Sequence, residues 1–247
     1  MSAIVLPTQK SKPNLDFINQ KFLTIGASGI GKSNFWAQED KALFIETEAG
    51  LNFESVMKLP ARSWNDIRDI YASLRQAEKD NKFPYSMIVI DTGDRLLDLA
   101  EEEIVNRARE FYKSIADQIN TIGDIPNGGG WSKTRELMMN FINKMEQLPC
   151  ALSIISHLST KRVEEGVRKY DKHTISLWAG MGNDMLAWAD HILHVESQIV
   201  GDKMQRTVYT IPTQTREAKS RGGVIPNQWK WEADAKVNYA MLRKMFT

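Results

Sequence analysis

Eight consecutive residues near the start of the chain have the types and spacing of a loop that binds phosphate. They are Gly26, Ala27, Ser28, Gly29, Ile30, Gly31, Lys32 and Ser33, and they satisfy the pattern G-x-x-x-x-G-K-[ST] at every fixed position. Glycines let the backbone curl closely around a phosphate, so that successive N–H groups converge on it. In this pattern the lysine neutralises the β- and γ-phosphate oxygens and the following hydroxyl holds Mg²⁺. The motif therefore predicts a nucleoside triphosphate site with Lys32 and Ser33 in these roles.

The segments on either side of this loop are the ones that such a motif requires. Residues 21–25 predict a short buried strand, and residues 33–39 predict the start of a helix. The helix N-terminus points its N–H groups and the positive end of its dipole at the phosphates. A chance match in a glycine-rich turn would not bring both neighbours with it, so the context favours the functional interpretation.

Two further apolar runs end in carboxylates. Residues 42–45 predict a buried strand that leads into Glu46-Thr47-Glu48, and residues 85–90 predict another that ends at Asp91. The carboxyl ends of parallel strands meet at the edge where an open α/β sheet binds its ligand. Asp91 is therefore interpreted as the residue that binds Mg²⁺ through water and orients Ser33. Glu48 is either part of the site or a surface residue in an ion pair.

A later apolar strand, residues 150–157, ends at His157 on the same predicted edge, where it is either a site residue or an ordinary core histidine. The next segment, residues 158–177, is rich in cations. Charge alone leaves two interpretations open: a solvated β-hairpin in which residues 160–163 pair with 172–177 around Gly166, or a cationic loop that follows a phosphodiester backbone. The cations are Lys161, Arg162, Arg168, Lys169 and Lys172.

The order of the remaining segments predicts the fold class. Helices expected at 63–78, 95–111 and 132–147 alternate with the buried strands, which is typical of a parallel α/β sheet, and strands at 190–195 and 203–211 add antiparallel pairing near the C-terminal side. Residues 119–130 contain Gly128-Gly129-Gly130 and predict a flexible loop. Residues 215–223 predict a basic turn that carries Lys219 and Arg221. This turn is either functional or simply a solvated surface turn.

Length and composition limit the possible domain organisation and the kinds of ligand. The 247 residues suit one α/β domain with an arm: we expect an N-terminal arm over residues 1–20 and an ATPase domain over 21–247. Ile4-Val5-Leu6 in the arm either frays or adds a short strand to a neighbouring subunit. A hydrophobic share of 42% fits a globular core, and the net charge of +1 excludes global basicity, so any nucleic-acid contact needs a local patch.

Cysteine usage and apolar run lengths bear on the compartment. The single cysteine, Cys150, excludes an intrachain disulfide, and we expect a buried thiol in a reducing, cytosolic compartment. The first residues lack the basic region of a signal peptide, and no segment approaches the roughly 20 apolar residues of a membrane span. We therefore expect a cytoplasmic protein without a membrane partner.

Taken together, these motifs resemble those of the RecA-like recombinases. Residues 44–50, Phe-Ile-Glu-Thr-Glu-Ala-Gly, resemble the motif that follows the phosphate loop in that family, where the second acidic residue polarises the attacking water; this implies that role for Glu48. Residues 85–91 resemble their Walker B strand. The resemblance implies that His157 senses the γ-phosphate, a place where the bacterial recombinases usually have glutamine. Lys219-Ser220-Arg221 resembles the basic residues that RecA-like filaments and ring helicases insert into the neighbouring subunit's ATP site.

More closely, the chain resembles phage-encoded ATP-binding proteins with a minimal RecA core, which act as single-strand annealing proteins. The resemblance covers most of residues 22–223. It implies an α/β P-loop NTPase fold with a RecA-like core, and a location in the cytoplasm of a bacterial host. It also implies that the glycine-rich loop, with Lys133 just after it, is a first DNA-binding loop and that the cationic stretch after His157 is a second.

Two functions from different classes follow. The first is an ATP-dependent single-stranded DNA-binding protein for recombination or annealing, with a DNA-stimulated ATPase. It would act as a filament or ring, with a single-strand-binding protein or nuclease as a further partner, and a replicative helicase is its variant. The alternative is a P-loop ATPase that acts on protein partners or a small molecule, as a regulatory switch or phosphotransferase, without DNA binding. The near-neutral charge favours the second; the loops, Lys219 and Arg221 favour the first. The missing N-K-x-D guanine motif favours ATP over GTP.

Overall fold

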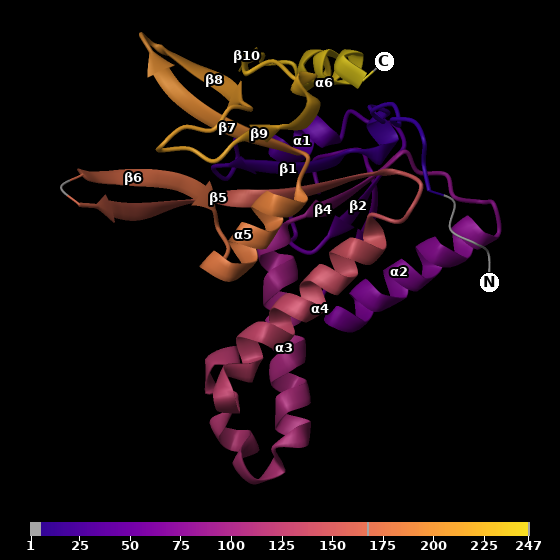
Figure 1. The fold of residues 1–247 in the computed structure, drawn as a ribbon, viewed down its shortest axis with the longest axis vertical. Coiled ribbons are helices and arrows are strands. Elements are labelled where there is room, and N and C mark those ends of the chain that lie inside the picture. The colour runs from indigo at the N-terminus through magenta and orange to yellow at the C-terminus, as the bar shows by residue number, and fades with distance from the viewer. Residues whose placement is uncertain (1–5, 167, 247) are drawn as a thin grey trace.

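The computed structural model describes residues 6–166 and 168–246 and shows a ten-stranded mixed sheet between two layers of helices (Figure 1). The main path of the sheet runs in the order β10-β8-β7-β1-β5-β4-β2-β3, with β6 paired to β5 and β9 paired to β7. Strands β3, β2, β4, β5, β1 and β7 are parallel, whereas β8 and β10 are antiparallel. This arrangement confirms the predicted α/β fold class.

The strands are β1 Lys21–Gly26, β2 Ala42–Glu46, β3 Met57–Pro60, β4 Met87–Asp91, β5 Ala151–Glu165, β6 Arg168–Ile175, β7 His191–Val200, β8 Lys203–Tyr209, β9 Lys219–Ser220 and β10 Gln228–Trp231. The α-helices are α1 Lys32–Trp36, α2 Trp64–Lys79, α3 Gly93–Phe111, α4 Gly129–Met145, α5 Ala179–Trp188 and α6 Ala235–Arg243. The predicted helix after Ser63 is confirmed with its reciprocal cap, in which Ser63 Oγ accepts from Asp66 N–H and the Asp66 carboxylate accepts from Ser63 N–H.

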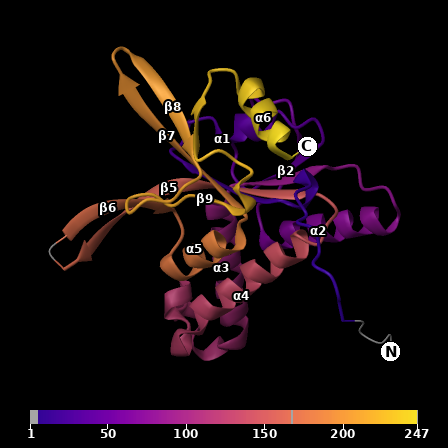
Figure 2. The same ribbon diagram turned by 45° about the horizontal axis from the view of Figure 1, so that its top comes forward.

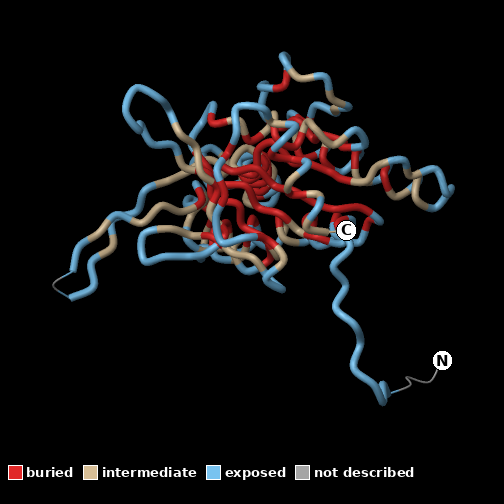
Figure 3. Tube along the Cα trace, turned by 90° about the horizontal axis from the view of Figure 1, so that it is seen from above, coloured by how far each residue is buried: buried red, intermediate tan, exposed pale blue. Residues whose placement is uncertain are grey.

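Each face of the sheet carries its own apolar core. Helices α2, α3, α4 and α5 bury their apolar stripes against one face, and α1 and α6 cover the other (Figure 1). Aromatic rings dominate the second core, where Phe35 of α1 packs against Trp231 of β10 and Tyr239 of α6. The central strands are buried on both faces, which is why they are continuous apolar runs in the sequence (Figure 3).

Parts of the molecule project from this body, and the β7–β8 hairpin is one of them (Figures 1 and 2). The far ends of α3 and α4 form a helical extension, and β5 with β6 forms a hairpin that reaches beyond the sheet (Figures 1 and 2). The hairpin pairs antiparallel from Leu158↔Ile175 to Glu165↔Arg168. The hairpin interpretation of the cationic segment is therefore confirmed as a structure, and whether this hairpin binds DNA stays a prediction.

The prediction of a flexible loop over residues 119–130 is wrong. Ile119, Ile122 and Ile125 are buried in a small core with α3, and α4 already begins at Gly129. A Cβ on Gly130 would lie 2.0 Å from the carbonyl oxygen of Ile122. This glycine therefore permits close packing rather than flexibility.

Residues 6–16 lie in no helix or strand. Leu6 is 79% exposed and lies in no strand, while Ile4 and Val5 lie outside the described residues (Figure 3). Phe17 is buried beside Phe22 and Phe246. Pairing of the arm with a neighbouring subunit stays a prediction.

Cys150 is a buried free thiol, as expected, and burial raises its pKa to about 12. Among the helices of residues 6–166 and 168–246, none has both the length and the apolar character needed to cross a bilayer.

His191 makes the free energy of unfolding depend on pH. Its imidazole is buried at the start of β7, with Nε2 3.2 Å from Gln20 Oε1 and Nδ1 3.3 Å from Ser220 Oγ, and burial lowers its pKa to about 4. An unfolded histidine titrates near about 6.5, so between these values the unfolded chain binds more protons than the folded one. The free energy of unfolding should therefore decrease as pH falls through this window.

We predict that His191 lowers the free energy of unfolding by up to about 3 kcal/mol between pH 6.5 and pH 4. Denaturant unfolding of the wild type and of His191→Gln across this range measures the contribution, because glutamine keeps hydrogen-bonding groups but does not titrate. Equal pH slopes for the two proteins would contradict it.

Candidate functional site

One cavity of about 440 Å³ collects most of the predicted catalytic residues. It lies at the edge of the sheet where the parallel strands end. Its lining includes Ser28, Gly29, Gly31, Lys32, Ser33, Glu48, Asp91 and His157, together with Asn34, Glu54, Thr92 and Arg206. The phosphate loop, both carboxylates and the histidine thus come from four segments of the chain to one site.

Strand register explains this convergence. Gly26 at the end of β1 is level with His157 on β5 and with Val195 on β7. Asp91 at the end of β4 is level with Glu46 on β2 and Ile155 on β5. Residues just beyond these positions therefore share one edge of the sheet, as expected for a ligand site in an open α/β sheet.

The loop itself has the backbone that phosphate binding requires. Gly29 and Gly31 have φ values of 72° and 106°, and the N-cap position Gly31 leaves the first turn of α1 without a side-chain cap. The Lys32 ammonium donates to the carbonyl oxygens of Gly26 (2.8 Å) and Ala27 (2.9 Å). Burial lowers the pKa of Lys32, whereas the nearby Asp91, Asp94 and Glu48 act in the opposite direction.

The donor set also suits Mg²⁺, a hard cation that prefers oxygen ligands. The Asp91 carboxyl is buried, and burial is the main cause that raises its pKa, whereas the Ser33 hydroxyl and the charge of Lys32 act in the opposite direction. Ser33 and Asp91 would hold the cation, which would neutralise charge on the phosphates. The groups present therefore fit a magnesium–triphosphate ligand.

Glu46, the last residue of β2, and Glu48, two residues beyond it, lie in different environments. Glu46 is buried and paired, with Lys58 Nζ at 3.2 Å and Arg62 Nη2 at 3.3 Å. Glu48 is exposed to the cavity, and its Oε2 accepts from Thr92 Oγ1 at 3.4 Å. Only Glu48 is therefore placed to act on a ligand, as the sequence interpretation requires, and its catalytic role stays a prediction.

The position of His157 is fixed by contacts with Asp94, a residue that sequence reasoning missed. The Asp94 carboxylate accepts from His157 N–H (3.0 Å) and Ser156 Oγ (3.2 Å), and His157 Nδ1 lies 3.5 Å from its Oδ2. Burial raises the pKa of Asp94. The available signal was its place in the first turn of α3, three residues after Asp91. The structure thus places His157 in the cavity rather than in the core, and the sensing role stays a prediction.

Lys219 and Arg221 lie at the opposite edge of the sheet. Lys219 pairs with Ile192 at the start of β7, and its ammonium donates to the carbonyl oxygens of Leu186 (2.8 Å) and Ala187 (3.1 Å) at the end of α5. Arg221 bonds Asp190 at 2.9 Å. Neither residue lies at the phosphate loop of its own chain, so an ATP contact would have to be made in another subunit.

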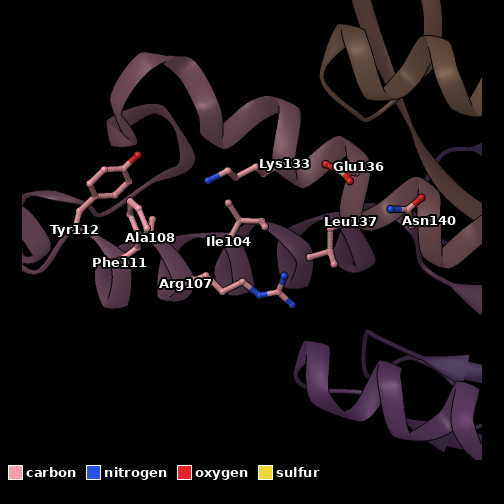
Figure 4. A pocket seen from close by; sticks show the side chains of 9 residues that line it. All are labelled: Ile104, Arg107, Ala108, Phe111, Tyr112, Lys133, Glu136, Leu137 and Asn140. Carbon is pink, nitrogen blue, oxygen red and sulfur yellow. The ribbon is translucent and has the colours of Figure 1, made fainter.

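The predicted DNA-binding cations fall into two places. Five lie on the β5–β6 hairpin: Lys161, Arg162, Arg168, Lys169 and Lys172. Of these, Arg162, Lys169 and Lys172 pair with Asp171, Glu164 and Glu217. Lys133 lies apart from them on α4, beside a cavity of about 400 Å³ between α3 and α4 (Figure 4). Lys133 is therefore brought neither to the hairpin nor to the phosphate loop.

Arg206 is a second site residue that sequence reasoning missed. It lies on β8, and its Nη1 is 3.6 Å from where a Cβ on Gly31 would lie. Within the described part of the chain it has no hydrogen bond or ion pair from its side chain. Nothing in the local sequence marks it, because only the folding of β8 alongside β7 brings it to the cavity.

We predict that Arg206→Ala weakens ATP binding by about 10- to 100-fold, the range for one lost charge-assisted hydrogen bond. Isothermal titration with ATP and Mg²⁺ measures the change. Lys203→Ala on the same strand, which lies outside the cavity, is the matched control and should bind as the wild type does. An unchanged Kd for Arg206→Ala would contradict a contact with the nucleotide.

Comparison with known protein families agrees with this geometry. A family model described as an AAA domain matches residues 18–222, which is well over half of the chain. A search of curated proteins found no match. ATPases of this kind typically use ATP and Mg²⁺, for which the cavity offers Lys32, Ser33 and Asp91. The chain therefore belongs to the AAA domain family and is a P-loop ATPase.

Proposed function

We propose that this ATPase binds single-stranded DNA in an ATP-dependent manner and acts in recombination or annealing as a filament or ring. The observation that carries the proposal is the continuity of β5. This single strand passes the nucleotide cavity at His157 and continues to Lys161 and Arg162. Its second half forms the projecting hairpin with β6 (Figure 2). A ligand change at His157 would therefore be transmitted along one strand to a cationic surface.

The hairpin supplies a backbone-binding surface of the kind that single strands use. Its residues 158–177 contain five Lys and Arg side chains against three carboxylates. Lys161 and Arg168 make no ion pair within the described residues, so their charges remain available to phosphates. Electrostatic contacts of this kind carry sequence-independent affinity that decreases with salt.

A pair of tryptophans beside the hairpin supplies a surface for stacking bases. Trp131 at the start of α4 meets Trp178, just after β6, with ring centroids 5.3 Å apart and planes at 89°. Trp131 is 45% exposed, and Trp178 is fixed by a hydrogen bond from Nε1 to Glu101. Exposed aromatic rings next to cations are how proteins bind single strands without sequence preference.

The catalytic part of the proposal assigns one role to each side chain. Glu48 orients the attacking water, Lys32 neutralises the phosphate oxygens, and His157 responds to the γ-phosphate. Lys219 and Arg221 stabilise the transferring phosphoryl group of the neighbouring subunit. Their place at the edge of the sheet opposite the phosphate loop supports a head-to-tail assembly, in which that edge of one subunit meets the cavity of the next.

We predict that single-stranded DNA raises the ATPase rate of the wild type and that DNA binding weakens as salt is raised. Trp131→Ala should lower the affinity for a single-stranded oligonucleotide by about 5- to 150-fold, the range for one lost stacking contact. Trp131→Phe, which keeps a ring, is the control. Fluorescence anisotropy and a coupled ATPase assay provide the two measurements.

An ATPase rate that is the same with and without DNA, together with no DNA retention at low salt, would contradict DNA binding. That result would favour an ATPase that acts on a protein partner or a small molecule.

Glu48 and Glu46 provide a matched pair of variants. We predict that Glu48→Gln lowers kcat by about 100- to 10,000-fold, the usual contribution of a positioned base, with ATP affinity and stability retained. Glu46→Gln should instead lower the free energy of unfolding by about 1 to 3 kcal/mol, because it removes the charge that pairs with Lys58 and Arg62. A normal kcat for Glu48→Gln would exclude it as the catalytic base.

Lys219 is tested by mixing two inactive variants. We predict that Lys32→Ala and Lys219→Ala subunits are each inactive and recover part of the ATPase activity when they are mixed. In such mixtures an intact Lys32 can face an intact Lys219 of its neighbour. Light scattering of the mixture verifies assembly. No recovery in a mixed oligomer would mean that Lys219 only caps the end of α5.

A further inference from the structure

Two histidines and a glutamate meet where the basic hairpin lies against β7, and none of the three lines the nucleotide cavity. His173 belongs to β6, and His194 and Glu196 belong to β7. Their metal-ligating atoms all lie within 4.8 Å of one another. The ATPase chemistry described above uses none of these three residues.

Each of the two imidazoles has one buried ring nitrogen without a hydrogen bond to any of the described residues. His194 is fully buried, and its Nδ1 lies 2.8 Å from the carbonyl oxygen of Glu217, to which it donates. This bond fixes the proton on Nδ1 and leaves a lone pair on Nε2. Among the described residues, neither His194 Nε2 nor the buried Nδ1 of His173 has a hydrogen-bond partner. A buried nitrogen atom without a partner destabilises the folded state, so two of them beside a carboxylate indicate a site for a ligand.

We propose that His173, His194 and Glu196 form a binding site for a divalent transition metal, with Zn²⁺ as the best fit. Imidazole and carboxylate ligands suit zinc, which binds them at about 2.0 to 2.2 Å in a tetrahedron. That geometry puts neighbouring ligand atoms about 3.4 Å apart. His194 Nε2 and Glu196 Oε1 are already separated by 3.4 Å, so one edge of the tetrahedron is formed.

Arg216 completes the surroundings of the site. Its guanidinium donates to both oxygens of Glu196, at 2.7 and 3.0 Å, and stacks on the ring of Tyr209 at 3.5 Å. A carboxylate oxygen has two lone pairs, so Glu196 Oε1 can bind a metal while it accepts from Arg216. The hydrogen bond from His194 to Glu217 and the Arg216–Glu196 pair are the outer contacts that orient metal ligands in proteins.

The metal would fasten the hairpin to the sheet. His173 also exchanges backbone hydrogen bonds with the segment that follows β8, since its N–H donates to Thr215 at 2.8 Å and its carbonyl accepts from Glu217 at 3.2 Å. That segment leads directly into Lys219. A metal bridging β6 and β7 would therefore fix the base of the hairpin relative to β7, which lies beside the phosphate-loop strand β1.

The test is titration of the metal-free full chain with ZnCl₂ in the presence of excess Mg²⁺, which occupies oxygen-rich sites. We expect one zinc per chain and a rise in Tm of about 5 to 10 °C at 100 times the Kd. His173→Gln should weaken zinc binding by more than about 100-fold, because loss of an outer contact alone costs 10- to 100-fold. His157→Gln removes a histidine elsewhere and should bind zinc as the wild type does.

Circular dichroism confirms that each variant is folded, and Glu196→Gln provides a second ligand variant if His173→Gln is not. No zinc-dependent change in the wild type would overturn the site. Equal zinc affinity in the wild type and in folded His173→Gln or Glu196→Gln would also overturn it, as would loss of binding in His157→Gln alone.

Discussion

The chemistry of this ATPase depends on the register of its parallel strands. Hydrogen bonding between β1, β5, β4 and β2 sets Gly26 level with His157 and Asp91 level with Glu46. Gly26 and His157, which are 131 positions apart along the chain, therefore lie level at one edge. A slip of one residue in any of these strands would turn its side chains to the other face and dismantle the cavity.

The second constraint is that one strand serves two parts of the molecule. β5 is buried between β1 and β4 over its first half and becomes one arm of an exposed hairpin over its second half. Its change from apolar to cationic side chains follows this change of environment. The two halves of β5 meet near Ser156 and His157, which both donate hydrogen bonds to the Asp94 carboxylate. The nucleotide cavity and the hairpin therefore adjoin at this point of the strand.

Features that a local pattern determines could be predicted from the sequence. The phosphate loop, the strand that ends at Asp91 and the Ser63 cap could all be predicted, because spacing and side-chain chemistry determine them locally. The glycines at 128–130 led to the wrong prediction of a flexible loop. Gly130 instead allows close packing on Ile122, a contact that forms only in the folded chain. Strand β3 escaped notice because its four residues are not buried and end in Pro60. Arg206 and the His173–His194–Glu196 cluster depend on pairing between distant strands, which no local pattern records.

Under the proposed function, β5 couples the nucleotide cavity to the hairpin. Hydrogen exchange of the hairpin amides, followed with a non-hydrolysable ATP analogue and with ADP, measures this coupling directly. We predict that the analogue slows exchange between residues 158 and 175 relative to ADP, and that His157→Gln removes the difference. Exchange that is identical with both nucleotides, in a protein shown to bind both, would contradict it.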